Sequence, residues 1–544
     1  MSSSARPRCL CSSTESVVRM TETVSLPGLV RQRAESMGDD VALAVVEQDR
    51  RYTWSDLHQR SSAWSAMLAR LGITKGDVVA TMLSAGDQAA VSWIGTAGLG
   101  ALETPLNHAY KGDWLRRVLS TIGPKAIVID ERFCAVWEPL LGELTVPVLI
   151  SDGVSRQGFL SAADLLGDST QSVPMIDGGL GDPACVILTS GTTGRSKGVV
   201  VPWGRCAGTL PLAEALDPDG DGTYYNPFPT FHWSARGPVY RAAARGTSLV
   251  TRQGFKTSAW LDDVRRFGCT DTLLIGAMMS FLMASAPLPD DADNPIRACV
   301  GGPVPPFIEE FAARFGIDRV VATYGMSEIV NVFLTPPGTS VSAQTYQSCG
   351  KEAGFPVRLM RDEDTVAEVD EIGELQVGGD RSALNLGYLN DPEATAQAWT
   401  QDGWFKTGDL FRRDADGYYY FVDRLKDSLR RRGENISSTE VEEIALQHPA
   451  VEECAVVAVP SEWSEDEVMI FVVVAEGAGV SPKELTEFMA ERVPAFAVPR
   501  FVEFVDELPK TPSLKIQKAV LRSRGRGPET WDRSRDAVHS AAKT

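Results

Sequence analysis

The segment Leu188–Val200 concentrates groups that can bind a phosphate chain. It reads LTSGTTGRSKGVV and is framed by the apolar runs Ala184–Ile187 and Val199–Val201. Its hydroxyl, glycine and lysine residues include Thr189, Ser190, Thr192, Thr193, Gly191, Gly194, Gly198 and Lys197. Glycines let backbone N–H groups approach a ligand closely, and a run of such groups forms an anion-binding concavity. We therefore predict a strand–loop–strand unit that binds a polyphosphate, in preference to an ordinary surface turn.

This loop is not a Walker A motif. That motif needs Gly-Lys-Ser/Thr after its second glycine, whereas Gly194 is followed by Arg-Ser-Lys. The P-loop NTPases are therefore excluded as a class.

The elements that must position this loop alternate between helical stretches and short apolar runs. The apolar runs are Asp77–Met82, Ala126–Ile129, Val146–Ile150, Thr272–Ile275, Ala298–Val300 and Arg319–Tyr324. Such alternation predicts an α/β fold of mostly parallel sheets covered by helices. After Ile372 the pattern changes to short strands with turns, as in Gly373–Val377 and Gly417–Val422.

The C-terminal part predicts a small α+β domain. Ser437 and Glu440 have capping-box spacing before a first helix, and Ser481, Pro482 and Glu484 begin a second helix that ends near Arg492. The expected strands are Cys454–Val459, Val468–Val474 and Phe501–Val505. The predicted organisation is an extension at 1–22, a large domain at 23–422, a boundary at 423–427, a small domain at 428–522 and a mobile tail at 523–544.

Composition excludes several partners. The 544 residues carry a formal charge of -19, which repels nucleic acid. The most apolar stretch, Ala89–Leu102, is shorter than the roughly 18 residues of a membrane span, so we expect a buried helix.

The nine cysteines form no CxxC pair and no Cys/His ligand spacing. We therefore expect reduced thiols, no structural zinc and a cytoplasmic location.

Several motifs in a fixed order resemble the ANL adenylate-forming superfamily, which includes acyl-CoA synthetases, peptide-synthetase adenylation domains and luciferases. They are TSGTTGRSKG, Tyr324–Glu328 (YGMSE), Gly403–Asp409 (GWFKTGD), Asp423–Asp427 (DRLKD), Gly433–Ile436 (GENI) and Pro509–Lys518 (PKTPSLKIQK). Asn107–Gly112 (NHAYKG), Tyr420–Arg424 with the RGENIS that follows, and Thr530–Arg533 (TWDR) look most like the carnitine/crotonobetaine-CoA ligase branch. The resemblance implies a large AMP-binding domain, a hinge at 423–427 and a mobile small domain.

The resemblance also implies roles for single residues. Lys515 is the expected catalytic lysine, and Glu328 the expected Mg²⁺ ligand, with Ser327 beside the α-phosphate. Asp409 and Arg424 are expected at the ribose, and Gly301, Gly302, Pro303, Tyr324 and Gly325 at the adenine. His232 is expected to gate the acyl pocket and the pantetheine tunnel, although a lone histidine is more often structural. Lys426 is the expected hinge residue, and Arg432 and Gly433 are expected to line the tunnel.

The implied reaction joins a small carboxylic acid to CoA with ATP and Mg²⁺. The acid attacks the α-phosphate to give an acyl-adenylate and pyrophosphate, and the CoA thiol then displaces AMP. Two departures from the family pattern stand out, because Leu514 and Arg432 occupy positions where relatives usually have glycine. An adenylation-only enzyme that serves a partner enzyme or a carrier-protein thiol therefore stays open. A non-catalytic nucleotide-binding relative and a homodimer are also left open.

Overall fold

The computed structural model describes residues 24–153, 155–166, 173–189, 196–302, 304–362, 364–424, 428–431, 434–461, 466–509, 516 and 518–535. The expected extension at 1–22 lies outside these residues, as do the predicted site residues Ser190, Gly191, Thr192, Thr193, Gly194, Pro303, Lys426, Arg432, Gly433 and Lys515. For Arg424 only the backbone is described. In the described residues no helix is both long and apolar enough to cross a membrane.

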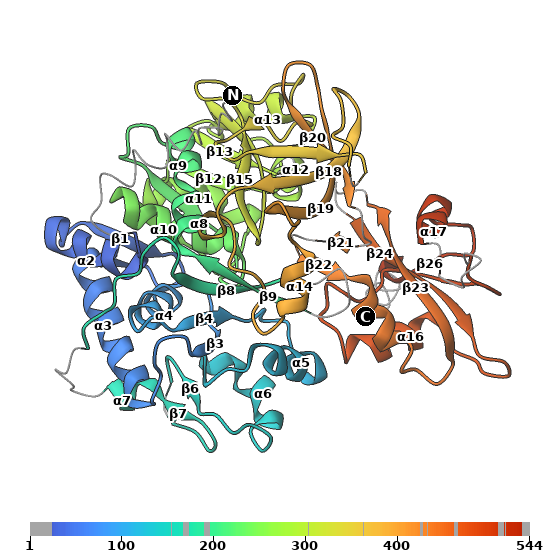
Figure 1. Cartoon of the computed structure of the whole chain (residues 1–544), viewed down its shortest axis with the longest axis horizontal. Helices are drawn as coiled ribbons and strands as arrows, with labels where there is room; N and C mark the ends of the chain where they lie inside the picture. The colour runs from blue at the N-terminus through green and yellow to red at the C-terminus, as the bar shows by residue number, and fades with distance from the viewer. Residues whose placement is uncertain are drawn as a thin grey trace, which may run out of the picture.

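A nine-stranded sheet forms the centre of the large body in Figure 1, in the order β16-β15-β14-β13-β12-β10-β11-β1-β2. Its strands are β1 (Val41–Val45), β2 (Arg50–Thr53), β10 (Thr223–Asn226), β11 (Ser248–Thr251), β12 (Asp271–Leu274), β13 (Ala298–Gly301), β14 (Arg319–Met326), β15 (Ile329–Leu334) and β16 (Lys351–Glu352). The strands from β14 to β1 pair in parallel, and antiparallel pairs close both edges. This confirms the predicted α/β class.

A second, all-parallel sheet has the order β4-β3-β5-β6-β7. Its strands are β3 (Val78–Met82), β4 (Leu102–Pro105), β5 (Ala126–Ile129), β6 (Val148–Ile150) and β7 (Leu160–Ser161). Two antiparallel units complete the large domain: the hairpin of β8 (Pro183–Thr189) and β9 (Lys197–Pro202), and a sheet of β17 (Val357–Met360), β18 (Ile372–Gly378), β19 (Trp404–Arg413) and β20 (Tyr419–Arg424).

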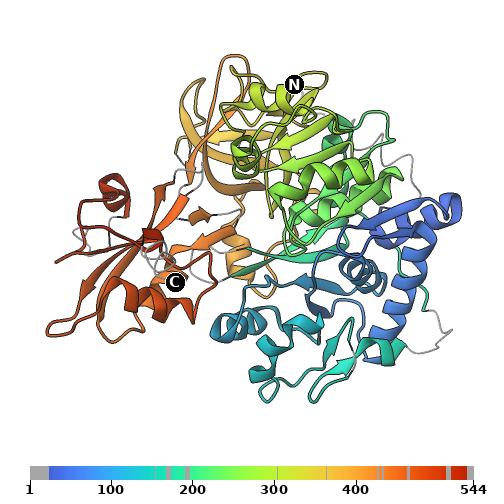
Figure 2. The ribbon, with the colours of Figure 1, turned by 180° about the vertical axis from the view of Figure 1, so that it is seen from behind.

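Helices pack around the sheets of the large domain, as the rear view in Figure 2 shows. They are α2 (Leu26–Met37), α3 (Trp54–Arg70), α4 (Asp87–Gly98), α5 (Gly112–Ile122), α6 (Cys134–Trp137), α7 (Ala162–Leu166), α8 (Trp203–Ala207), α9 (Leu210–Leu216), α10 (Trp233–Arg245), α11 (Trp260–Phe267), α12 (Gly276–Ala284), α13 (Ile308–Phe315) and α14 (Pro392–Gln397). Short 3-10 turns stand at Glu131–Phe133, Glu138–Leu140, Thr257–Ala259 and Arg381–Ala383.

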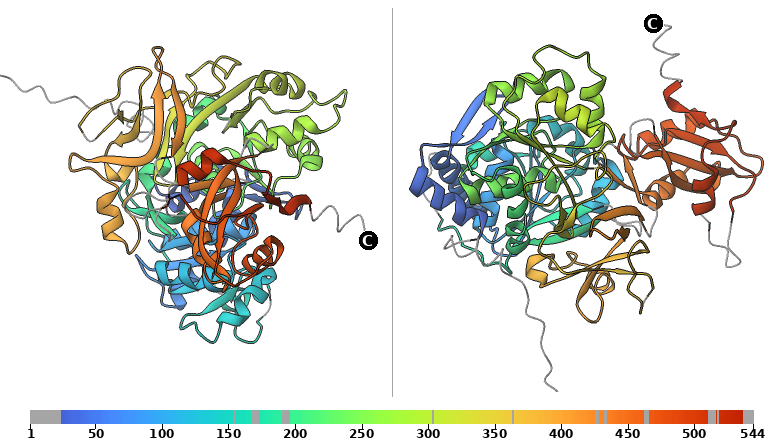
Figure 3. Two further views of the ribbon diagram at one scale, coloured as in Figure 1. Left: turned by 90° about the vertical axis from the view of Figure 1, so that its right-hand side faces the viewer. Right: turned by 90° about the horizontal axis from the view of Figure 1, so that it is seen from above.

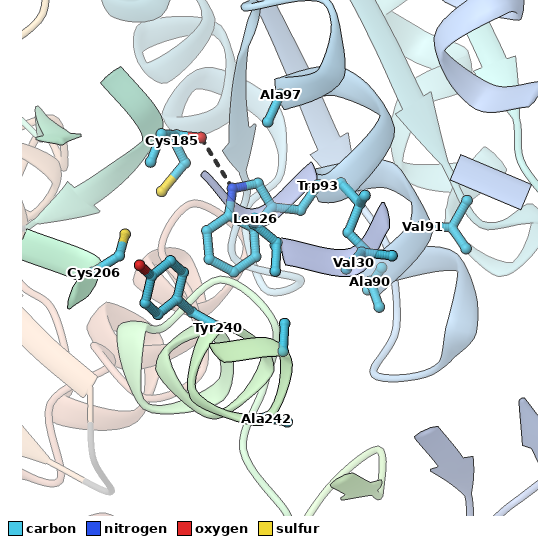
Figure 4. Close-up of a cluster of buried hydrophobic side chains, with 14 of the residues drawn as sticks. Leu26, Val30, Ala90, Val91, Trp93, Ala97, Cys185, Cys206, Tyr240 and Ala242 are labelled. Carbon is cyan, nitrogen blue, oxygen red and sulfur yellow. Dashed lines mark hydrogen bonds between the residues drawn. The ribbon is translucent and has the colours of Figure 1, made fainter. Parts of the chain in front are cut away.

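The largest apolar core lies where α2, α4, α8 and α10 meet (Figure 4). Trp93 of α4 is 1% exposed, its indole N–H donates to the carbonyl of Ala184 at 3.0 Å, and its ring stacks on Trp203 with centroids 6.1 Å apart. The predicted buried helix is therefore confirmed for Ala89–Gly98, whereas the end of the apolar stretch Ala89–Leu102 differs, because Leu102 begins strand β4. Truncating such a buried ring costs about 3–5 kcal/mol.

The C-terminal part is a separate unit, drawn in orange and red at one side of the large body (Figures 1 and 3). It contains the hairpin of β21 (Ser428–Arg431) and β22 (Glu434–Ser437), the sheet β23-β24-β25-β26, and three helices. Their bounds are β23 (Val451–Pro460), β24 (Asp466–Val474), β25 (Phe501–Phe504), β26 (Trp531–Asp532), α15 (Ser438–Ala445), α16 (Pro482–Ala490) and α17 (Lys518–Arg524). The predicted capping box of Ser481 and Glu484 is present on α16.

The prediction that a mobile tail starts at residue 523 was wrong. Trp531–Asp532 forms β26, which adds to the small sheet next to β25. Asp532 also pairs with Arg500, with 3.1 Å between Asp532 Oδ1 and Arg500 Nε. Strand pairing and this ion pair, which join positions far apart in the sequence, hold residues that composition alone assigns to a tail.

Candidate active site

The carboxyl ends of four parallel strands bring the predicted adenine and acyl residues together. β10, β12, β13 and β14 are neighbours, and their pairing register aligns Leu274, Gly301 and Ala322. The chain leaves the first three strands toward the predicted His232 loop, Gly276 and Gly302, and Tyr324 lies in the last part of β14, two residues after Ala322. Ligands of open α/β sheets bind at this edge, so residues from separate motifs share one site.

Strands β8 and β9 pair on either side of the predicted phosphate loop, and we call these two strands together with Ser196 the phosphate hairpin. Thr189 pairs with Lys197, so the ends of the two strands next to residues 190–195 lie side by side. The chain at 386–389 hydrogen-bonds along the other side of β9, with Leu389 N donating to Gly198 O at 2.7 Å. A side chain at Gly198 would place Cβ 2.8 Å from Val186. Glycine is therefore required here for packing.

Glu328 is a carboxylate buried beside this hairpin and 5% exposed. Its Oε1 accepts a hydrogen bond from the Tyr388 hydroxyl at 3.1 Å, and its backbone carbonyl accepts one from Asn385 Nδ2 at 2.9 Å. Lys197 Nζ lies over the ring of the same Tyr388, 4.8 Å from its centroid. The phosphate hairpin and the expected metal ligand thus meet at one tyrosine.

A fully buried arginine supports the turn that carries Glu328. Arg205 of α8 is 1% exposed, and its Nη2 donates to the carbonyls of Met326 at 2.8 Å and Ile329 at 3.2 Å. Its guanidinium also lies 4.1 Å from the centroid of the Trp233 ring. Burial lowers the pKa of Arg205 to about 10, which still leaves it charged at neutral pH. The bonds on both sides of Ser327–Glu328 fix the backbone of this turn.

Tyr324 and Asp409 form the expected nucleoside end of the site. The Tyr324 hydroxyl donates to Asp409 Oδ2 at 2.6 Å, and Asp409 is 3% exposed. The Tyr324 ring packs against Phe411 and Phe333, with centroids 4.7 and 6.0 Å away. Arg424 stands opposite Asp409 in the pairing of β19 with β20. The two residues predicted at the ribose are therefore neighbours in space.

His232 lies at the end of a loop that neighbouring side chains anchor. It occupies the N-cap position of α10, and its ring lies 4.7 Å from that of Phe231. Arg236, one turn into α10, donates to the carbonyl of Thr230 at 2.9 Å and pairs with the buried Glu103 at 2.7 Å. The structure thus shows how the loop is anchored, and the gating role stays a prediction.

The methionine-rich run lies on α12. Met279 and Leu282 are buried and Phe281 is 42% exposed. Gly276 begins the helix at the carboxyl edge of β12. Part of this run is therefore core, and its contact with an acyl group stays a prediction.

Three supporting residues were missed from the sequence: Tyr388, Arg205 and Asn385. Each contacts Glu328 or the turn around it, as described above. Tyr388 and Asn385 stand in NLGYLN and Arg205 in WGRCA, and neither segment has a spacing typical of catalysis. Only the fold places them beside residues more than fifty positions away.

The small domain touches the phosphate hairpin through Glu440 of α15. This carboxyl group is 6% exposed, and Ser196 Oγ donates to its Oε1 at 3.4 Å. Nearby, Arg117 pairs with Glu443 at 3.1 Å, and Lys111 Nζ donates to the carbonyl of Ala490 at 3.0 Å. Burial raises the pKa of Glu440 to about 7, whereas Arg117 and Ser196 act to lower it. Ionisation of Glu440 therefore places a charge inside the domain contact.

We expect the stability of the protein to fall as the pH rises through 7 because of Glu440. Its pKa rises from 4.5 to about 7 on folding, so the folded protein binds more protons than the unfolded chain between these values. The free energy of unfolding then decreases with rising pH, by on the order of 2 kcal/mol between pH 5.5 and 8.5. Chemical denaturation of wild type and Glu440→Gln at pH 5.5 and 8.5 measures this. Glu440→Gln should lose the decrease, and the surface control Glu487→Gln should keep it; an equal decrease in all three would contradict the assignment.

The site fits Mg²⁺ that is held mainly by nucleotide. Among the described residues no group of three or more His, Cys, Asp or Glu side chains gathers as a metal cage. Mg²⁺ usually binds one or two carboxylates together with substrate phosphates. The buried carboxylate of Glu328, which shares Tyr388 with Lys197 of the phosphate hairpin, matches that donor set.

Comparison with known proteins agrees with this geometry. A family model described as AMP-binding enzyme matches residues 30–389, and one described as AMP-binding enzyme C-terminal domain matches residues 440–515. A crotonobetaine/carnitine–CoA ligase of Salmonella heidelberg is 29% identical over 500 residues, which are 87% of this chain and 93% of the relative.

Two solved structures share the fold. An amide bond synthetase from Marinactinospora thermotolerans has a TM-score of 0.81 at 25% identity, covering 91% of this chain and 99% of that one. An o-succinylbenzoate CoA synthetase from Bacillus subtilis, bound to a product analogue, has a TM-score of 0.79 at 24% identity, covering 93% and 99%. The family model over residues 30–389 covers more than half of the chain and shows that the chain belongs to the AMP-binding enzyme family.

Proposed function

We propose that this protein is an AMP-forming acid:CoA ligase. The observation that carries the proposal is a pair of contacts near the carboxyl end of β14: Tyr388 contacts both Lys197 and Glu328, and Tyr324, four positions before Glu328, contacts Asp409. A basic phosphate hairpin, a buried carboxylate and a second carboxylate beside an aromatic ring match the triphosphate, metal and nucleoside of ATP. The matched CoA ligase from Salmonella supports CoA as the acceptor.

The first step joins two anions, the carboxylate of the acid and the α-phosphate of ATP. Two such charges about 4 Å apart repel by about 4 kcal/mol at an effective dielectric constant near 20. Mg²⁺, when bound, supplies positive charge to the phosphates. Lys197 adds to it from the hairpin, and Lys515, by its register in LPKTPSLKIQK, adds a further positive charge from the small domain.

Glu328, Asp409 and Tyr324 bind and orient the nucleotide in this scheme. Asp409 accepts hydrogen bonds from the ribose, and Tyr324 both fixes Asp409 and offers its ring to the adenine. Attack of the carboxylate oxygen on the α-phosphorus forms the acyl-adenylate and releases pyrophosphate. The CoA thiol then attacks the acyl carbon, gives its proton to solvent and displaces AMP. Lys426 is the proposed hinge for the domain movement between the two steps.

One assay separates the candidate functions. Pyrophosphate release is measured with ATP, Mg²⁺ and a panel of carboxylic acids, with and without CoA, while acyl-CoA and AMP are followed by mass spectrometry. The proposal expects acid-dependent pyrophosphate release and CoA-dependent AMP release. Acyl-adenylate without transfer to CoA would favour the adenylation-only alternative that Leu514 and Arg432 leave open. Binding of nucleotide without release of pyrophosphate would indicate a non-catalytic nucleotide-binding relative.

We expect Arg432→Gly to change the second step more than the first. Glycine permits the close backbone approach that a pantetheine arm needs, and a guanidinium can block that arm or bind CoA phosphates. Pyrophosphate release should stay within about threefold of wild type because the phosphate hairpin lies in the large domain. Acyl transfer to CoA, measured on the same preparation, should increase. An unchanged transfer rate would show that Arg432 has no part in it, and Arg430→Gly on the same hairpin is the matched control.

A further inference from the structure

Tyr388 has no role in the reaction as described so far, yet it lies between two groups expected at the phosphates. It stands in the segment that pairs with β9, where Val199 and Tyr388 form an antiparallel bridge. The amide of Val200 donates to the carbonyl of Gly387 at 2.9 Å, and the amide of Tyr388 donates to Thr395 Oγ1 at 2.9 Å. The backbone of Tyr388 is thus fixed to the phosphate hairpin itself.

The Tyr388 hydroxyl acts on Glu328. It donates to Glu328 Oε1 at 3.1 Å. A bond from a fixed donor to one carboxylate oxygen sets the plane of the carboxylate. Hydrogen bonds to charged groups are the strong class, worth about 1.5–3 kcal/mol in measured series. The orientation of Glu328 therefore depends on this phenol.

The Tyr388 ring acts on Lys197. The ammonium nitrogen lies 4.8 Å from the ring centroid, within the range of a cation–π contact. Lys197 and Glu328, which have opposite charges, thus both contact the same aromatic side chain. Without the ring, the ammonium and carboxylate groups attract each other across the space it fills. A direct ion pair between them would withdraw both charges from the nucleotide.

We propose that Tyr388 is a positioning residue of the ATP site: its hydroxyl orients the Glu328 carboxylate for a divalent cation, and its ring keeps the Lys197 ammonium beside the phosphates and away from that carboxylate. The inference rests on the proposed function, because it assigns ATP and Mg²⁺ to this edge of the sheet. The hydroxyl and the ring of Tyr388 thus have different roles, and a separate substitution can remove each of them.

The hydroxyl is tested by Tyr388→Phe, which keeps the ring. Mn²⁺ replaces Mg²⁺, and bound Mn²⁺ is titrated by electron paramagnetic resonance with ATP present and no acid, so that no turnover is needed. We expect Mn²⁺ affinity to fall about tenfold while ATP affinity without metal stays within about twofold. Tyr420→Phe is the matched control, because the Tyr420 hydroxyl donates to Asp414 at 2.8 Å in the turn between β19 and β20.

The ring is tested by Tyr388→Leu in the same titration and in pyrophosphate release. Excess Mg²⁺ should restore Tyr388→Phe to near the wild-type rate, whereas Tyr388→Leu should stay at least tenfold slower because Lys197 is also displaced. Equal Mn²⁺ affinity in wild type and Tyr388→Phe would overturn the inference, as would an equal loss in Tyr420→Phe. If Tyr388→Leu does not fold, the Tyr388→Phe titration decides alone. Wild type that binds no Mn²⁺ with ATP would instead contradict the proposed function.

Discussion

Glu328→Gln should lower acid-dependent pyrophosphate release by about a hundredfold or more, the usual cost of losing one charge placed for the transition state. The buried carboxylate has its backbone fixed by Arg205 and Asn385 and its Oε1 bonded to Tyr388. Glutamine has nearly the size of glutamate, and its amide oxygen can still accept the hydrogen bond from Tyr388. A lower rate is therefore due to the missing negative charge. Initial rates at increasing Mg²⁺ measure it, and excess Mg²⁺ should recover only part of the rate.

The chain supplies a matched control for this substitution. Glu352 on β16 also accepts a hydrogen bond from a tyrosine, from Tyr419 at 2.5 Å, but it belongs to the edge strand of the first sheet. Glu352→Gln therefore removes the same charge from the same kind of contact. It should leave the rate within about twofold of wild type, since surface changes cost little. Equal rates for Glu328→Gln and wild type would remove Glu328 from the metal site.

Lys515→Ala should abolish adenylate formation, with a loss of about a hundredfold or more, while ATP binding persists. The groups assigned to ATP on the structure, including Lys197, Glu328 and Asp409, all belong to the large domain. The lysine is needed only when charge develops in the first step, so transfer of acyl from a supplied acyl-adenylate to CoA should survive. Pyrophosphate release, ATP titration and thioester formation are measured on one preparation.

Lys510→Ala is the control for this lysine, because it removes a like charge five positions away in the same segment. It should retain most of the activity in both steps. Loss of both steps in Lys515→Ala would indicate damage to the small domain instead of a catalytic role. Pyrophosphate release near the wild-type rate would refute the assignment.

The sequence by itself determined the fold class and supplied the candidate residues of the site. Alternating apolar runs and helices are local patterns, and β3, β5, β13 and α16 follow them within one or two residues. The phosphate loop is also a local pattern, because glycines, hydroxyls and a lysine follow one another between two apolar runs. Glu328, Asp409 and Tyr324 are predicted instead from the resemblance of their motifs to the ANL superfamily, since each residue taken alone has an ordinary structural explanation.

Tertiary structure alone decided which side chains support that chemistry. Tyr388 reaches Glu328 because its segment pairs with β9, and Arg205 reaches the YGMSE turn because α8 packs against β15. The contact of Glu440 with Ser196 depends on how the small domain meets the hairpin, and β26 forms only because a sheet edge is available to Trp531–Asp532. Such contacts join residues distant in the chain, so no local spacing encodes them. They arise when packing brings the elements together.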